Sequence, residues 1–282
     1  MPDTFIAIMY DFDKTLCTKD MQEYSFIPKL GMSSSEFWSA ADSLAKDKKM
    51  DSILAYMYLM ITKATAAQQK ILRQNFVELG SDLEFFPGVE TWFERINRYG
   101  EEANVKIEHY IISSGLREII EGSSIYKNFK EVFACEFLYD INGVACWPKN
   151  AVNYTTKTQF LFRISKGVLD ISQDNELNRY TPEEDRRIPF MNMIYIGDGL
   201  TDVPCMKLVK SYGGSSLAVY KADEKAKVDD LLLHSRVDFT ILADYTENSE
   251  LDVIVKDTIK HIALSDLLRR KNKQQIDEIK KL

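Results

Sequence analysis

The sequence predicts a doubly wound parallel α/β sheet with a small all-helical domain inserted after its first strand. Residues 4–10 form an unbroken apolar run, typical of a strand buried on both faces of a parallel sheet. From residue 87 onwards, apolar strands alternate with helical patterns, as in βαβ units. No strand signal appears between residues 18 and 84. We therefore expect an α/β core domain of residues 1–17 and 86–282, and a helical cap domain of residues 18–85.

Three helices are predicted within the cap. A Ser-Ser-Ser-Glu capping box at 33–36 opens a helix that runs through about Ala45. Asp51 is placed to cap a second helix, "SILAYMYLMITKA". Thr65, with a glutamine three residues on, is expected to start a third, "AAQQKILRQNFVELG", which Gly80 closes.

The core elements follow from local signals along the rest of the chain. Pro87-Gly88 opens the helix "VETWFERINRYG", and Asn142-Gly143 predicts a tight hairpin within residues 131–147. Thr155 or Thr156 is expected to cap the helix "KTQFLFRIS". The polar segment 166–189 is predicted to be a solvent-exposed segment outside the core. The remaining expected elements are strands at 108–115, 191–199, "SLAVY" and "VDFTIL", and helices at about 116–122, from 201, at 223–233 and from 249.

The composition disfavours several classes of partner and site. The 282 residues carry a net charge of −7, which disfavours nucleic acid or an anionic membrane as the main partner. The four cysteines form no Cys-x-x-Cys pair, so we expect reduced thiols rather than a disulfide framework or a zinc site. No stretch approaches the roughly 20 apolar residues of a membrane span. These features predict a soluble cytoplasmic protein, and they leave its oligomeric state open.

Charged and polar residues gather where the predicted strands end. Asp11 and Asp13 follow the first strand and point to the same face of it, where their charges repel. The carboxyl ends of parallel strands meet at one crevice, so Ser113, Lys157 and the acidic "GDGLTD" segment should converge there. A carboxylate-rich crevice of this kind suits Mg²⁺, which would neutralise the repulsion.

Each of these groups has a use in phosphoryl transfer. Asp11 could attack phosphorus, and Asp13 could protonate the leaving alkoxide and later deprotonate water. Ser113 and the amides at the start of the next helix could bind phosphoryl oxygens. Lys157 would supply positive charge to the transition state, although an ordinary exposed lysine in a first helical turn is the alternative.

"DFDKTL", "IISSG", Lys157 and "GDGLTD" resemble the four motifs of the haloacid dehalogenase superfamily, in their usual order. The helical insertion resembles the cap of its phosphoserine-phosphatase-like members. The resemblance implies a phosphatase with an aspartyl-phosphate intermediate and Mg²⁺ as cofactor. Its implied roles are Asp11 as nucleophile, Asp13 as general acid/base, Thr15 steadying the loop, Ser113 and Lys157 holding the phosphoryl group, and Mg²⁺ bound by Asp11, the Asp13 carbonyl and Asp198, with Asp202 in support.

The substrate is less defined than the chemistry. In the phosphoserine phosphatases, the position matching Asp20 holds a glutamate that contacts the substrate ammonium, so a small amine-bearing phosphomonoester is one expectation. The alternative is that Asp20 only caps the next helix. Ser114 could replace Ser113 in phosphate binding, with Gly115 beside it.

Two other functions stay open: phosphoryl transfer to a small alcohol, and a non-catalytic sensor of Mg²⁺ or a phosphate ligand.

Overall fold

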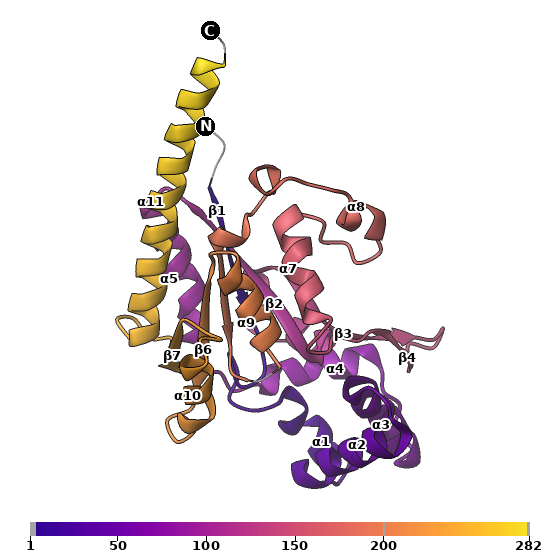
Figure 1. Cartoon of the computed structure of the whole chain (residues 1–282). Helices are drawn as coiled ribbons and strands as arrows, with labels where there is room; N and C mark the ends of the chain where they lie inside the picture. The colour runs from indigo at the N-terminus through magenta and orange to yellow at the C-terminus, as the bar shows by residue number, and fades with distance from the viewer. Residues whose placement is uncertain (1–3, 200, 281–282) are drawn as a thin grey trace.

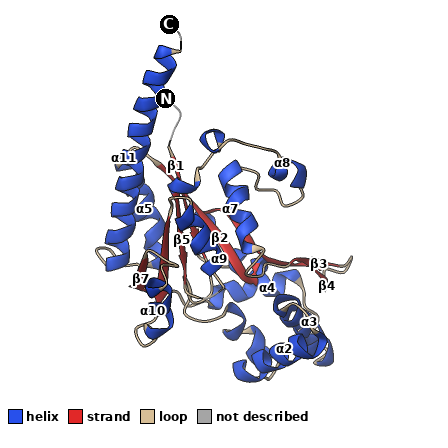
Figure 2. Ribbon diagram, in the orientation of Figure 1, coloured by secondary structure: helices blue, strands red, loops and turns tan. Residues whose placement is uncertain are grey.

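The computed structural model describes residues 4–199 and 201–280, apart from the side chain of Glu184; Leu200 of the "GDGLTD" motif lies outside the described residues. Its centre is a seven-stranded sheet in the order β4-β3-β2-β1-β5-β6-β7 (Figures 1 and 2). The strands are β1 (Phe5–Tyr10), β2 (Lys106–Leu116), β3 (Phe129–Tyr139), β4 (Ala145–Asn150), β5 (Met193–Gly197), β6 (Ser215–Tyr220) and β7 (Phe239–Leu242).

Some helices pack against the two faces of the sheet, and another group, α1 to α4, follows β1 in the sequence. The α-helices are α1 (Phe26–Lys29), α2 (Ser34–Lys48), α3 (Ser52–Ala66), α4 (Arg73–Leu79), α5 (Val89–Glu102), α6 (Arg117–Glu121), α7 (Lys157–Lys166), α8 (Asp174–Asn178), α9 (Val203–Ser211), α10 (Ala226–Leu233) and α11 (Glu250–Ile279). The 3₁₀ helices are η1 (Met21–Glu23), η2 (Gly80–Asp82), η3 (Tyr126–Asn128), η4 (Glu183–Asp185) and η5 (Phe190–Asn192).

The predicted parallel sheet is confirmed. All neighbouring strands are parallel except the β3–β4 hairpin. Strand β1 lies between β2 and β5, and its last residue, Tyr10, is in register with Ile111 and Ile196. Because β1 is covered on both sides, residues 6–10 are all fully buried, as their apolar sequence predicts. This register places the residues that follow β1, β2 and β5 side by side.

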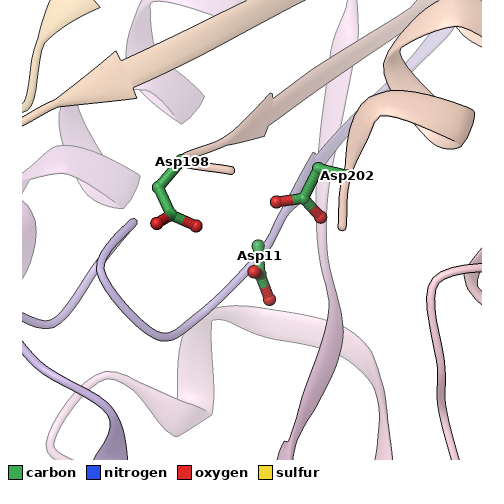
Figure 3. A group of neighbouring side chains, drawn as sticks. All are labelled: Asp11, Asp198 and Asp202. Atoms are coloured by element: carbon green, nitrogen blue, oxygen red, sulfur yellow. The ribbon is translucent and has the colours of Figure 1, made fainter. Parts of the chain in front are cut away.

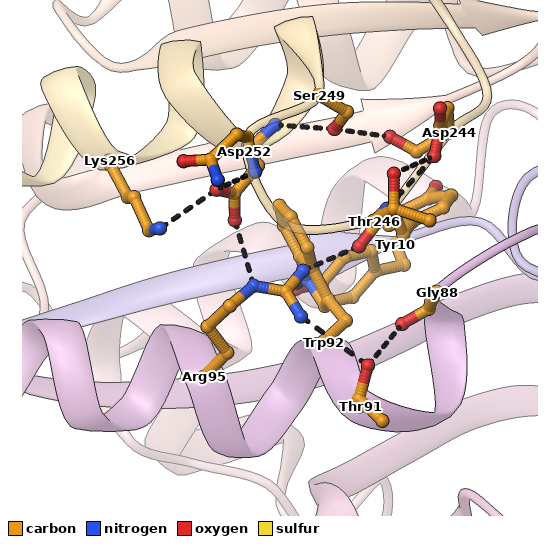
Figure 4. A network of polar contacts seen from close by, with 12 residues as sticks. Tyr10, Gly88, Thr91, Trp92, Arg95, Asp244, Thr246, Ser249, Asp252 and Lys256 are labelled. Atoms are coloured by element: carbon orange, nitrogen blue, oxygen red, sulfur yellow. Dashed lines mark hydrogen bonds and ion pairs between the residues drawn. The ribbon is translucent and has the colours of Figure 1, made fainter.

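Helices α5 and α11 lie on one side of the sheet, and α7 and α9 lie together on the other (Figure 1). An ion pair fixes α11 against α5: Asp252 accepts from Arg95 at 3.0 Å and also pairs with Lys256 at 2.8 Å (Figure 4). Asp252 is buried, so this pair is shielded from water and from salt. The contact holds the long C-terminal helix to the sheet.

The helices that follow β1 form a cap beyond the carboxyl ends of the strands (Figure 1). Two of the predicted starts are confirmed. Ser33 and Glu36 form a reciprocal capping box at α2, and the Asp51 carboxylate accepts from the amides of Ile53 and Leu54 at α3. The division at residues 18–85 stays a prediction.

The predicted start of the third cap helix is wrong. Thr65 lies inside α3, where its hydroxyl donates to the Ile61 carbonyl. Gln68 then adopts a left-handed φ of 55°, and α4 begins only at Arg73. Thr65 thus belongs to the last turn of α3, and it does not begin a new helix.

One expectation in the core is also corrected. Neither Thr155 nor Thr156 caps α7 with its side chain; instead the Asn153 side chain accepts from both of their amides. The segment 166–189 is largely exposed, as predicted, and it also contains the short helix α8. Buried Arg163 anchors this segment by donating to the carbonyl of Asp170. In the part of the chain that is described, no helix is both long and apolar enough to cross a membrane.

A buried polar chain joins β1, β2 and α5. The Trp92 indole donates to the Tyr10 hydroxyl at 2.8 Å, and that hydroxyl lies 2.9 Å from Nδ1 of His109. On the other side of the ring, Nε2 lies 3.1 Å from the Asn97 side-chain oxygen. These contacts satisfy a neutral imidazole, and burial lowers the pKa of His109 to about 3.

We predict that His109 makes folding stability depend on pH. Because its pKa is depressed in the folded state, its contribution is present above its ordinary value of 6.5 and is lost as pH falls toward 3. Between pH 7 and pH 5 this loss should be about 2 kcal/mol. Urea unfolding of wild type and His109→Gln at both pH values measures it. The variant should lose that much less stability over this interval, whereas the exposed His261→Gln should follow wild type; equal losses in wild type and His109→Gln would contradict the prediction.

Candidate active site

Three carboxylates meet at the carboxyl edge of the sheet (Figure 3). Asp11 directly follows β1, Asp198 directly follows β5, and Asp202 precedes the first turn of α9. One oxygen of each lies within 4.8 Å of those of the other two. The register of β1 with β5 brings Asp11 and Asp198 together, as the sequence predicts.

Lys157 is the cation of this group. It is the first residue of α7 and is fully buried, so it is not the exposed lysine of the alternative interpretation. Its Nζ lies 3.1 Å from Asp11 Oδ1 and 2.7 Å from Asp202 Oδ1. Burial alone would lower the pKa of Lys157, but the two carboxylates outweigh it and raise this pKa. Lys157 therefore stays charged between them.

The group still carries more negative than positive charge. Burial and the neighbouring Asp202 raise the pKa of Asp11 to about 7, although Lys157 opposes them. Burial, together with Asp11 and Asp202, also raises the pKa of Asp198 well above its ordinary value. Buried Asp202 Oδ2 has no hydrogen-bond partner within residues 4–199 and 201–280. Excess charge and an unpartnered carboxylate oxygen fit a hard divalent cation such as Mg²⁺.

Tyr195 and Gly197 support Asp202 from β5. The buried Tyr195 hydroxyl donates to Asp202 Oδ1 at 2.7 Å. A Cβ at position 197 would lie 2.6 Å from Asp202 Oδ2, so only glycine lets the carboxylate approach. The sequence analysis missed Tyr195, because a tyrosine inside an apolar strand has the pattern of an ordinary core residue.

The Asp13 carboxylate is not part of the three-aspartate group. Its Oδ1 accepts from the Met21 amide at 2.7 Å, and its Oδ2 faces Gly115, where a Cβ would lie only 2.8 Å away. Burial is the main cause that raises the pKa of Asp13 well above its usual value, and Asp20 and Asp11 add to it. Asp13 can therefore carry a proton, whereas Asp11 forms an ion pair with Lys157.

The hydroxyl groups predicted to bind substrate also gather near these strand ends. Ser113 is fully buried, and its Oγ accepts from the Gly115 amide at 2.9 Å, which leaves its hydroxyl hydrogen free to donate. Ser114 Oγ and Thr15 Oγ1 are buried without a hydrogen-bond partner among the described residues. The cap reaches the same place, because the Tyr56 hydroxyl of α3 donates to the Ser114 carbonyl at 2.7 Å.

Asp20 does not have a free carboxylate. It forms an ion pair with Lys14, at 2.6 Å between Nζ and Oδ2. It also makes no side-chain hydrogen bond at the start of η1, so the helix-capping alternative is wrong. Lys14 has a left-handed φ of 56°, a conformation that gave no signal in the sequence.

Comparisons with known proteins agree with this architecture. The sequence profile of the haloacid dehalogenase-like hydrolases matches residues 8–207. An uncharacterised protein of Borreliella burgdorferi is 30% identical over 281 residues, covering 88% of this chain and 94% of that protein. A phosphoserine phosphohydrolase-like protein of Francisella tularensis has a TM-score of 0.53 at 19% identity, covering 89% of this chain and 98% of its own. A substrate-bound phosphoserine phosphatase has a TM-score of 0.55 at 13% identity, covering 90% and 99%. At these identities, the two structures show a shared fold.

We predict that Tyr195→Phe weakens Mg²⁺ binding about tenfold, because a group that orients a metal-binding carboxylate typically contributes that much. Isothermal titration calorimetry with MgCl₂ measures the affinity. Tyr110→Phe is the matched control, since this buried tyrosine donates instead to Glu108, at 2.6 Å. It should bind Mg²⁺ like wild type. Equal affinities for wild type and Tyr195→Phe would show that the hydroxyl does not position Asp202.

Proposed function

The chain belongs to the haloacid dehalogenase-like hydrolases, and we propose that it is a Mg²⁺-dependent phosphatase that hydrolyses a small phosphomonoester. One observation carries this proposal above the others. Asp11 lies 3.1 Å from a fully buried lysine and within reach of two further carboxylates, while Asp13 stands apart with a raised pKa. The two aspartates thus have different environments, as a nucleophile and a proton carrier require.

In the first half-reaction, an Asp11 oxygen attacks phosphorus and the bond to the leaving oxygen breaks. Lys157 favours the ionised form of Asp11, because its ammonium acts to lower the pKa of that carboxyl. Asp13 gives its proton to the leaving alkoxide, which departs as an alcohol. The product on the protein is an aspartyl phosphate at Asp11.

In the second half-reaction, Asp13 is a carboxylate and takes a proton from water. The water oxygen attacks phosphorus, the bond to Asp11 breaks, and inorganic phosphate leaves with both aspartates restored. The raised pKa of Asp13 supports this role, because a carboxyl whose pKa lies above its ordinary value more readily carries the proton that the leaving alkoxide needs.

Asp11, Asp198, Asp202 and the Asp13 carbonyl would hold Mg²⁺, which when bound supplies positive charge to the phosphoryl oxygens. Lys157 and the Ser113 hydroxyl would hold the phosphoryl group from the protein side. The unpartnered hydroxyls of Ser114 and Thr15 are candidates to support them, and Ser114 keeps its place as an alternative to Ser113. The cap, which we assign to residues 18–85, would exclude water during the first transfer.

The structure gives the amine-bearing substrate little support. Asp20, the carboxylate expected to bind a substrate ammonium, already pairs with Lys14. A sensor without catalytic activity is also less favoured, because binding alone has no use for a separate proton carrier at Asp13.

We expect Mg²⁺-dependent release of phosphate from p-nitrophenyl phosphate. Asp11→Asn should reduce kcat/KM by at least about 10³-fold, because it removes the nucleophile, and Asp13→Asn by roughly 10²- to 10⁴-fold. The control is Asp140→Asn, in the exposed turn of the β3–β4 hairpin, which should act like wild type. EDTA should abolish the activity and MgCl₂ restore it. Undiminished turnover by Asp11→Asn would refute the aspartyl-phosphate route.

Hydrolysis and transfer to an alcohol are separated by their products. With excess glycerol added, a hydrolase releases equal amounts of p-nitrophenol and inorganic phosphate, and this equality is the expected result. If Asp11 passed its phosphoryl group to glycerol, p-nitrophenol would exceed phosphate, and glycerol phosphate would account for the difference. That result would assign a phosphotransferase.

A further inference from the structure

A cavity of about 370 Å³ lies beside Asp198, on the β6 side of the candidate active site. It exists because β5 and β6 are parallel neighbours, with Gly197 in register with Ala218. The loops that follow these two strands therefore lie side by side at the carboxyl edge of the sheet. Lys14 and Asp198 line one part of the cavity, and Lys221, Glu224 and Lys227, after β6, line another.

The charges along the cavity leave one cation without a partner. Lys14 pairs with Asp20 at 2.6 Å, and Lys227 pairs with Glu224 at 2.7 Å. Lys221 is half-buried and forms no ion pair with residues 4–199 or 201–280. Because Lys221 lines the cavity and has no counter-ion among the described residues, its ammonium is suited to bind an anion that enters the cavity.

The carboxylates of the cavity are already engaged. Glu224 is held by Lys227, and Asp198 belongs to the three-aspartate group in which we place Mg²⁺. Asp20, which would attract a cationic substrate, is neutralised by Lys14. With Mg²⁺ bound at the three-aspartate group, the cavity would offer one uncompensated positive charge, that of Lys221, and no uncompensated negative charge among these carboxylates.

We propose that the cavity binds the leaving group of a phosphomonoester that bears a second anionic group, either a carboxylate or a phosphate, with Lys221 as the specificity-determining residue. This inference rests on the proposed phosphatase function, since it names the class of substrate for that site.

The test uses four three-carbon phosphomonoesters that differ only at the far carbon. They are propane-1,3-diol monophosphate, 3-phosphooxypropanoate, propane-1,3-diol bisphosphate and 3-aminopropyl phosphate. The full chain with Mg²⁺ should give a kcat/KM about tenfold higher for at least one anionic ester than for the neutral ester, and the lowest value for the amine. Lys221→Gln should reduce the anionic-to-neutral ratio about fivefold. Lys225→Gln, an exposed neighbour that does not line the cavity, should keep the wild-type ratio.

The outcomes separate this inference from the proposed function. Hydrolysis with no preference for either anionic ester, with the amine preferred, or with the same ratio in Lys221→Gln would overturn the inference and leave the phosphatase in place. If no ester is hydrolysed, the phosphatase proposal fails, and calorimetric titration with the two anionic esters tests the cavity alone. About fivefold weaker binding to Lys221→Gln than to wild type would then support the cavity, while equal binding or none would overturn it.

Discussion

The contact of Lys157 with Asp11 and Asp202 is the interaction on which the site depends. Its Nζ lies 3.1 Å from the first carboxylate and 2.7 Å from the second, and the side chain has no exposed surface. A single buried aspartate beside two others would be strongly driven to take up a proton. The ammonium opposes this for Asp11, because it acts to lower the pKa of that buried carboxyl.

That contact exists because three separate segments end at one edge of the sheet. The sheet order places β1 between β2 and β5, and short polar turns follow each strand. Close packing then allows few alternatives: glycine is needed at 197 for Asp202 and at 115 for Asp13 and Met21. The cap completes the enclosure through Tyr56, which binds the backbone at the end of β2. The register of β1 with β2 and β5 therefore determines both the fold and the position of the site residues.

Much of this could be predicted from the sequence, because strand ends and motif spacing are local signals. Asp11, Asp198 and Lys157 were identified in that way. Tyr195 was missed, since nothing in an apolar strand indicates which tyrosine will donate to a carboxylate seven residues on. The ion pair of Lys14 with Asp20 forms where Lys14 has a left-handed backbone conformation. This conformation could not be predicted, because lysine rarely adopts it. The late start of α4 depends on tertiary contact, because Leu72 pairs with Val144 of the hairpin turn.

The hydrogen bond from Tyr56 to the Ser114 carbonyl has one more consequence. Ser114 is adjacent to Ser113 in β2, so one stretch of this strand carries both the hydroxyl that we propose for phosphate binding and the carbonyl that anchors α3. An outward movement of α3 would break this bond and leave the Ser114 carbonyl with the Cys135 thiol, at 3.3 Å, as its donor. In the proposed phosphatase, opening of the cap for product release would therefore also disturb the strand end that binds the phosphate.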